Sequence, residues 1–100
     1  MIADVIGLIS VAKAKDEYGV IRETETEKEV YCDVQSVTRQ EFFDGGRNGL
    51  NPAYVFIVFA ADYSGEETVS FRGNRYGVYR TYENGDYMEL YVERKGGTNG

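Results

Sequence analysis

The sequence predicts an all-β protein, mainly antiparallel, folded as a small β-barrel or sandwich with one short helix in a long loop between strands. Three observations predict this class. Runs rich in Val, Ile, Tyr and Phe, which favour strands, follow one another along most of the chain. One run alternates between apolar and more polar residues, and two Gly/Asn pairs in the C-terminal third predict tight hairpin turns.

The length of 100 residues allows one modest core and is too short for two. We therefore expect a single β-barrel domain over residues 1–95. The last five residues, GGTNG at 96–100, are expected to form a flexible tail.

The first strand is expected over DVIGLISVAK, residues 4–13, because this run is rich in Val and Ile. The sequence KDEYG follows it, and its Gly19 can adopt the positive φ that a tight turn needs. We therefore expect a turn at this glycine.

The second run, residues 20–37, carries four carboxylates of one parity, which project from one face of an extended chain. We call them the acidic row: Glu23, Glu25, Glu27 and Glu29. Carboxylates spaced along a strand do not converge on one point. We therefore expect a solvated edge or loop that opposes sheet-to-sheet aggregation, and no metal site.

Later in the same run, Val30, Cys32 and Val34 alternate with more polar residues, which is typical of a half-buried strand. The chain has no His, so no imidazole can activate its only thiol. One Cys cannot form an internal disulfide, which fits a reducing compartment. We therefore expect Cys32 to be a core residue.

A short helix is expected over residues 39–44. Thr38 and Glu41 match a capping box, in which the hydroxyl accepts from a first-turn amide and the carboxylate reaches back. Gly45 and Gly46 are expected to stop this helix after about two turns.

So short a helix is not stable in water unless Phe42 and Phe43 are buried against something, and a neighbouring subunit is one candidate. The glycine-rich GGRNG that follows lacks the spacing of a dinucleotide fingerprint and the Lys-Ser or Lys-Thr of a P-loop. We interpret it as a turn.

The strand AYVFIVFA, residues 53–60, is apolar on both faces, and Pro52 stands just before it, where proline is tolerated. One face carries Tyr54, Phe56 and Val58, and the other carries Val55, Ile57 and Phe59. Two explanations stay open: a central barrel strand with a covering element, or an oligomer interface.

The C-terminal third contains two predicted hairpins. A turn at Gly73-Asn74 pairs Phe71 with Tyr76 and Val69 with Val78 on one face. A turn at Asn84-Gly85 pairs Tyr82 with Tyr87, Arg80 with Glu89, and Tyr79 with Leu90. Val78 then shares a face with the Arg80–Glu89 ion pair, so either the sheet twists or the register differs.

Composition excludes several functions. The net charge of −6 opposes binding to a phosphate backbone, and it argues against the 14 aromatic residues being base-stacking platforms. The longest apolar run is too short to span a membrane, and the N-terminus lacks signal-peptide features, so we expect a soluble cytosolic chain. Without His, an activated Cys or a convergent carboxylate pair, we expect no enzyme and no cofactor.

Three blocks of sequence, taken in order, resemble the head closure proteins of tailed phages and prophages, also called head-tail adaptor or head-tail joining proteins. They are VYCDVQSVTRQEFFDGGRNGLNPAYVF at 30–56, DYSGEETVSFRGNRYGVYRTY at 62–82, and DYMELYVERKGG at 86–97. The resemblance covers nearly the whole chain and is weakest over residues 1–28.

The resemblance implies a small β-barrel that forms a homo-oligomeric ring between the portal-bound connector and the tail. Such a ring helps to retain packaged DNA and offers a docking surface to the tail terminator or tail tube protein. It lets DNA pass without sequence-specific binding, is not an enzyme and does not involve a membrane. The protein would be found in the virion neck, and in the host cytoplasm before assembly.

The resemblance also implies that a long loop reorganises on assembly and projects toward the channel, and by position this is the segment over residues 39–53. We call it the assembly loop. Its expected partner-binding residues are Arg39, Glu41, Phe42, Phe43, Gly45, Gly46, Arg47, Gly49 and Leu50.

In this interpretation the loop gains its order from another subunit, on which its aromatic side chains and Leu50 are anchored. Arg39 and Arg47 are expected to pair with carboxylates there, including some of the acidic row. The acidic row itself is expected to face the channel and to repel DNA phosphates.

Two alternatives remain. A monomeric β-barrel module that binds a peptide or nucleic acid would stay monomeric and show affinity for its ligand. A tail-completion component would have similar interfaces and would bind the tail first.

Overall fold

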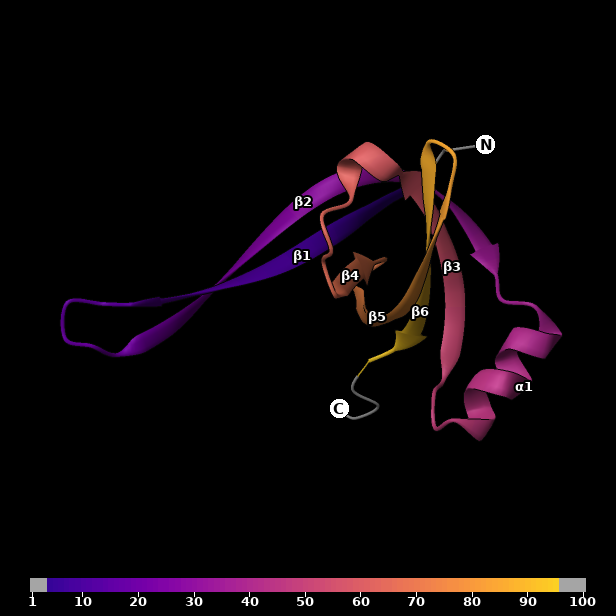
Figure 1. Ribbon diagram of the computed structural model, residues 1–100, viewed down its shortest axis with the longest axis horizontal. Coiled ribbons are helices and arrows are strands. Elements are labelled where there is room, and N and C mark those ends of the chain that lie inside the picture. The colour runs from indigo at the N-terminus through magenta and orange to yellow at the C-terminus, as the bar shows by residue number, and fades with distance from the viewer. Residues whose placement is uncertain (1–3, 96–100) are drawn as a thin grey trace.

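The computed structural model describes residues 4–95, and the predicted tail at 96–100 lies outside them. The described residues form β1 (Asp4–Lys15), β2 (Ile21–Ser36), α1 (Arg39–Arg47), β3 (Pro52–Phe59), the 3-10 helix η1 (Ala60–Asp62), β4 (Thr68–Phe71), β5 (Asn74–Asn84) and β6 (Tyr87–Arg94). The strands close into a barrel in the order β1-β2-β3-β6-β5-β4, with every neighbouring pair antiparallel (Figure 1). The predicted fold class is confirmed.

Alternating side chains of all six strands fill the barrel. The core consists of Ile6, Leu8, Val30, Cys32, Phe56, Val58, Val69, Phe71, Tyr76, Leu90 and Val92. Phe56 is fully buried at its centre, with the ring centroid 5.1 Å from that of Phe71. The alternation predicted from Val30 is confirmed, since Val30 and Cys32 are buried and Tyr31 is exposed.

The two apolar faces of β3 have different surroundings. Phe56 and Val58 point into the core. On the outer face, Val55 is buried near the end of β3 that lies beside α1, whereas Phe59 at the other end is 42% exposed. One end of the strand is therefore covered, as the first explanation expects. The other end leaves an apolar side chain exposed, so an oligomer interface remains possible only there.

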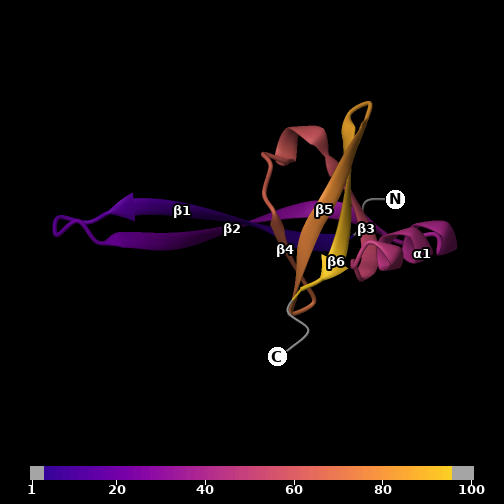
Figure 2. The same cartoon turned by 60° about the horizontal axis from the view of Figure 1, so that its bottom comes forward.

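The most conspicuous feature is a two-stranded arm, residues 10–29, that leaves the barrel. Strand β4 pairs with β1 only as far as Ile9, and β3 pairs with β2 only from Cys32 onward. Between these points β1 and β2 pair only with each other among the described strands, and the hairpin extends well beyond the barrel in both ribbon views (Figures 1 and 2). The arm makes the molecule 50 Å long but only 31 by 23 Å across.

The turn at the tip of the arm is the one predicted. Gly19 has φ of 79°, and its amide donates to the carbonyl of Asp16 at 3.0 Å. The Asp16 carboxylate accepts from the amides of Tyr18 and Val20, both at 2.9 Å. A hydrogen bond from the Arg22 side chain to this carboxylate lowers the pKa of Asp16 below its usual value.

The β4–β5 hairpin has a different register from the predicted one. Val69 faces Tyr76 and Phe71 faces Asn74, so the turn is Arg72-Gly73 rather than Gly73-Asn74. Both turn residues have positive φ, 51° and 80°, as type I′ turns require. The shift is two residues in register, so the predicted inward face is kept.

The β5–β6 hairpin also differs from the prediction. Its turn is Gly85-Asp86, and Tyr82 faces Glu89 instead of Tyr87. A bulge between Val78 and Arg80 changes the parity of β5 at this point. The bulge resolves the predicted conflict, because Val78 packs against the core while Arg80 faces outward.

Candidate interaction surfaces

Helix α1 begins with half of the predicted capping box. The hydroxyl of Thr38 accepts from the amide of Glu41 at 3.1 Å, as expected. The Glu41 carboxylate is bound elsewhere: it accepts from the hydroxyl of Tyr79 at 2.6 Å and from Nη2 of Arg80 at 2.7 Å. This carboxylate therefore connects the first turn of the helix to strand β5.

The same contacts set the ionisation of the cluster. The Arg80 guanidinium, followed by the Tyr79 hydroxyl, lowers the pKa of Glu41. Burial, followed by the hydrogen bond to Glu41, raises the pKa of Tyr79 above its usual range. Arg80 also lies over the ring of Tyr91, with Cζ 3.8 Å from the ring centroid. Near neutral pH the helix is therefore tied to the barrel by an ionised carboxylate.

The expectation that Gly45 and Gly46 stop the helix is wrong. Both lie inside α1, which continues to Arg47, and Gly49 with φ of 80° provides the left-handed residue beyond the end. Gly45 is buried, and a Cβ at this position would lie 2.5 Å from Cγ of Pro52. The glycine therefore allows close contact between the helix and the start of β3.

Two aromatic side chains of α1 remain on the surface. Phe42 is 48% exposed and Phe43 is 57% exposed, and their rings pack edge to face with centroids 5.9 Å apart. The helix thus lies on its own barrel through Glu41 and Gly45 without burying either phenylalanine. We call Phe42 and Phe43 the aromatic pair.

The other predicted residues of the assembly loop lie around this helix. Arg47 contacts Asp44 in the same helix, so its partner here is intramolecular rather than on another protomer. Arg39 is exposed and Leu50 is half-buried. The loop residues named from the sequence are therefore gathered on α1 and its C-terminal end, away from the acidic row on the arm.

The acidic row lies on β2 with all four side chains exposed, and the predicted solvated strand face is confirmed. Glu23 pairs with Lys13 at 3.6 Å, and Glu25 pairs with the guanidinium of Arg75 at 2.9 Å. The Arg75 hydrogen bond lowers the pKa of Glu25. Two of the four carboxylates thus have cationic partners within the same chain.

Glu27 occupies a particular position in this row. A Cβ at Gly7 would lie 2.1 Å from a carboxylate oxygen of Glu27, so the glycine leaves room for that side chain. Among residues 4–95, no three or more His, Cys, Asp or Glu side chains are placed so that they could hold a metal ion together.

A second exposed apolar surface, which the sequence did not identify, crosses one end of the barrel. We call it the apolar row: Val5, Tyr31, Phe59 and Tyr87 on β1, β2, β3 and β6. Val5 faces Tyr31, and Phe59 faces Tyr87 with the rings stacked at 5.3 Å. The pairing of Cys32 with Val58 places Tyr31 beside Phe59. All four side chains are exposed.

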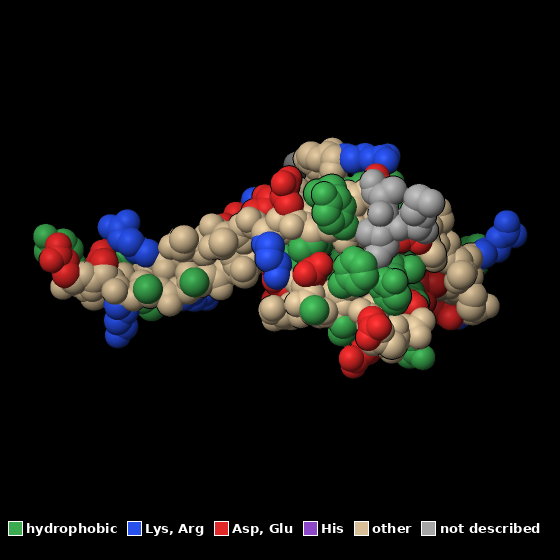
Figure 3. Space-filling view, turned by 90° about the horizontal axis from the view of Figure 1, so that it is seen from above, with side chains coloured by type: hydrophobic (Ala, Val, Ile, Leu, Met, Phe, Trp, Pro, Cys, Tyr) green, Lys and Arg blue, Asp and Glu red, His purple; other side chains and the backbone are tan. Residues whose placement is uncertain are grey.

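The arm carries a third such surface. Its large exposed apolar residues are Val11, Tyr18, Val20 and Ile21, with Tyr18 82% exposed at the tip. Lys13 and Lys15 follow Val11 on the same face of β1, and on β2 Glu25 faces Val11, Glu23 faces Lys13 and Ile21 faces Lys15. Figure 3 shows apolar, basic and acidic side chains together over the outer part of the arm.

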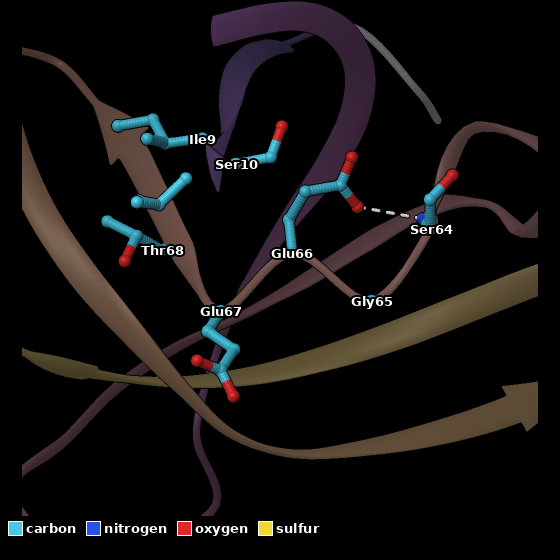
Figure 4. Close-up of a pocket in the computed structure, with 8 residues that line it drawn as sticks. Ile9, Ser10, Ser64, Gly65, Glu66, Glu67 and Thr68 are labelled. Atoms are coloured by element: carbon cyan, nitrogen blue, oxygen red, sulfur yellow. Dashed lines mark hydrogen bonds between the residues drawn. The ribbon is translucent and has the colours of Figure 1, made fainter. Parts of the chain in front are cut away.

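An open hollow of about 290 Å³ lies where β1 leaves the barrel, between Ser10 and the loop before β4 (Figure 4). The buried Glu66 lines it, and its carboxylate accepts from the amide of Ser64 at 2.7 Å. No basic or nucleophilic side chain other than serine or threonine hydroxyls lines this hollow. The hollow lies beside the edge of β1 with which no described strand pairs beyond Ile9.

Cys32 is buried in the core, as predicted. Burial, with smaller contributions from Asp4 and Asp33, raises the pKa of its thiol to about 12. The thiolate is therefore scarce near neutral pH. Within residues 4–95, no helix has the length and apolar character needed to cross a membrane.

No protein-family model and no curated protein sequence matches the chain.

Proposed function

We propose that this protein is a structural component of the neck of tailed phages, where it forms a ring between the portal-bound connector and the tail. It helps to retain packaged DNA and provides the surface to which the tail attaches. In this role it catalyses no reaction and requires no cofactor.

The observation that carries the proposal is a closed barrel with three exposed apolar surfaces: the arm, the apolar row and the aromatic pair. A monomeric soluble protein rarely exposes several such surfaces, whereas a subunit with neighbours on several sides needs them. The resemblance of the three sequence blocks to head closure proteins is the reason for proposing the phage neck as the location of this assembly.

In the proposed ring, the assembly loop contacts another neck component. Helix α1 presents Phe42 and Phe43 from a rigid position, because Glu41 and Gly45 fix the helix on the barrel. Aromatic side chains of this kind often dominate the binding free energy of interfaces. The connector or the tail terminator is the proposed partner of this surface.

The charge of the chain suits the passage of DNA. The net charge is −6, and the four exposed glutamates of the acidic row contribute to it. A wall of this sign repels phosphates, so DNA slides past without being bound. Replacing the four glutamates by glutamine is expected to slow DNA ejection, measured as release of dye-accessible DNA, and unchanged kinetics would contradict this part of the proposal.

The direct test adds the purified chain to DNA-filled heads that lack tails. We expect it to bind at the portal vertex, seen by electron microscopy, and to reduce leakage of DNA into a nuclease-accessible form. A matched control is the Phe42→Ser, Phe43→Ser double variant, which keeps the barrel and is expected to bind poorly. Binding to isolated tails but not to heads would instead favour a tail-completion component.

A further inference from the structure

We propose that the arm of each copy lies across the apolar row of a second copy of this chain, and that this contact links adjacent subunits of the ring. The inference rests on the proposed function only in that it names the contact by which such a ring is joined. The contact itself requires no other neck protein.

The chain exposes more surface than a compact monomer of its size. The chain exposes 6724 Å², whereas a folded monomer of 11.3 kDa is expected to expose about 5,700 Å². Its radius of gyration is 14.9 Å, against about 13 Å for a compact domain of this length. The excess of about 1,000 Å² is similar in size to the roughly 800 Å² that each partner contributes to a stable interface.

The arm also has unsatisfied strand edges. Beyond Ile9 no described strand pairs with the outer edge of β1, and before Cys32 none pairs with the outer edge of β2. An isolated two-stranded hairpin is marginally stable in water, and unpaired edges favour association with another chain. The arm therefore lacks the support that a neighbour would provide.

The base of the arm is braced in a fixed direction. On one side Glu25 and Arg75 form two hydrogen bonds, at 2.9 and 3.1 Å. On the other side the ammonium group of Lys28 donates to the carbonyl of Asp62 at 2.7 Å. A braced arm loses less conformational entropy on docking than a flexible one.

The arm cannot reach the apolar row of its own barrel. Val5 of the row and Lys15 near the tip stand at opposite ends of the single strand β1. Ten residues of extended chain separate them by about 33 Å. Contact between the tip and a row therefore requires a second molecule.

The two surfaces are complementary in chemistry. The arm offers Val11, Tyr18 and Ile21 together with Lys15, which makes no ion pair to any described residue. Glu25 and Glu23 stand on the same face, opposite Val11 and Lys13, but each has a cationic partner in its own chain, so Lys15 is the charge of this face left without a partner among the described residues. Acidic residues flank the row: Glu29 lines the surface beside Val5 and Tyr31, and the exposed Asp86 precedes Tyr87. Apolar contact with basic groups opposite acidic ones favours one orientation of docking.

Because the arm and the row are different surfaces of one chain, the contact is head to tail. A head-to-tail contact repeats from copy to copy and closes into a ring when the rotation between copies allows it.

The test uses two proteins that each carry one added cysteine, Tyr18→Cys at the tip of the arm and Tyr87→Cys in the row. The native Cys32 is buried and does not interfere. Mixed and mildly oxidised, concentrated in solution or bound to tailless heads, they are expected to form the Tyr18→Cys/Tyr87→Cys disulfide dimer. A mixture of Tyr18→Cys with Arg39→Cys, on helix α1, serves as the control and is expected to stay uncrosslinked.

A charge reversal tests the same contact without a crosslink. Lys15→Glu is expected to weaken self-association at least about threefold, measured by sedimentation, and Glu29→Lys in the same chain is expected to restore it. Arg94→Glu makes the same charge change away from both surfaces and should leave association unchanged. Thermal unfolding checks that every variant remains folded.

The outcomes separate this inference from the proposed function. A chain that closes heads but gives no arm-to-row crosslink under either condition overturns the inference and leaves the function intact. A crosslink in solution without binding to heads supports the inference and contradicts the function. A crosslink to Arg39→Cys in place of Tyr87→Cys, or no rescue by Glu29→Lys, also overturns the inference.

Discussion

Helix α1 and the arm both stand outside the barrel wall, and they are attached in different ways. The helix is held by a partly buried carboxylate that accepts from Tyr79 and Arg80, and by the close contact of Gly45 with Pro52. The arm is held at its base by polar contacts of exposed side chains, and its outer half contacts only itself among the described residues.

This difference separates two kinds of exposed apolar surface. The aromatic pair of α1 is presented by an element that is already docked, so it suits rigid recognition of a partner. The arm has no described strand paired with either of its outer edges, so its stability depends on a partner. Exposure alone does not distinguish the two, whereas the contacts beneath each surface do.

The largest expected effect contrasts the barrel core with the arm. Phe56→Ala should reduce the free energy of unfolding by about 3–5 kcal/mol, because it leaves a cavity in the centre of the core. Tyr18→Ala at the tip should change it by less than about 0.5 kcal/mol. Urea unfolding of both variants at a low protein concentration measures the contrast, and equal effects would show that the arm belongs to the folded core.

The next effect tests how the helix is docked. Gly45→Ala should lower stability by about 1–2 kcal/mol, because the new Cβ would collide with Pro52. Gly46→Ala has open space around its Cβ and should raise stability by about 0.5–1 kcal/mol through helix propensity. If both alanines stabilise the protein in urea unfolding, the contact between α1 and β3 is not as close as described.

A smaller effect is expected from the carboxylate that ties α1 to β5. Glu41→Gln should reduce stability by about 1 kcal/mol at pH 7, discounted because Arg80 is half exposed. The folded pKa of Glu41 lies below its usual value of about 4.3. The contribution of the ionised form is therefore full above that value and is lost as the pH falls through the folded pKa.

Unfolding curves of the wild type and the Glu41→Gln variant should thus differ at neutral pH and converge in acid. A difference that grows as the pH falls would contradict the assigned contact. Glu29→Gln, which removes an exposed carboxylate without an ion pair to any described residue, is the matched control.

The smallest effect concerns the brace of the arm. Arg75→Ala removes both hydrogen bonds to Glu25 and should leave global unfolding almost unchanged. Amide hydrogen exchange in residues 10–29 should become a few times faster, because the hairpin opens more often. Arg94→Ala serves as the control, and equal exchange in both variants would show that the brace does not hold the arm.

Much of the fold followed from local patterns in the sequence. The alternation after Val30, the turn at Gly19 and the cap at Thr38 each depend on a few neighbouring residues, and all three are present. The predicted burial of Cys32 followed from its place in that alternation.

The features that were missed depend on tertiary contacts. Both hairpin turns lie one residue from the predicted position: the first places Arg72 at a positive φ, and the second closes a hairpin that has a bulge after Val78. Helix α1 runs through two glycines because Gly45 packs on Pro52, which outweighs its low helix propensity.

The arm could not be predicted because its existence depends on where β3 and β4 stop pairing, which the residues of β1 and β2 do not encode. The alternation of Glu and Thr in β2 indicated solvent on one face only. The resemblance to head closure proteins led us to expect the assembly loop as the projecting element, whereas the longest projection is the hairpin before it.

The central claim is that the arm completes its structure on a second copy while α1 does not. Amide hydrogen exchange of the dilute monomer and of the assembled ring tests it most directly. The account predicts that residues 10–29 exchange fast in the monomer and become at least about tenfold more protected in the ring, with α1 protected by its own barrel in both states. An arm already protected in the monomer, or a ring in which only α1 gains protection, would contradict it.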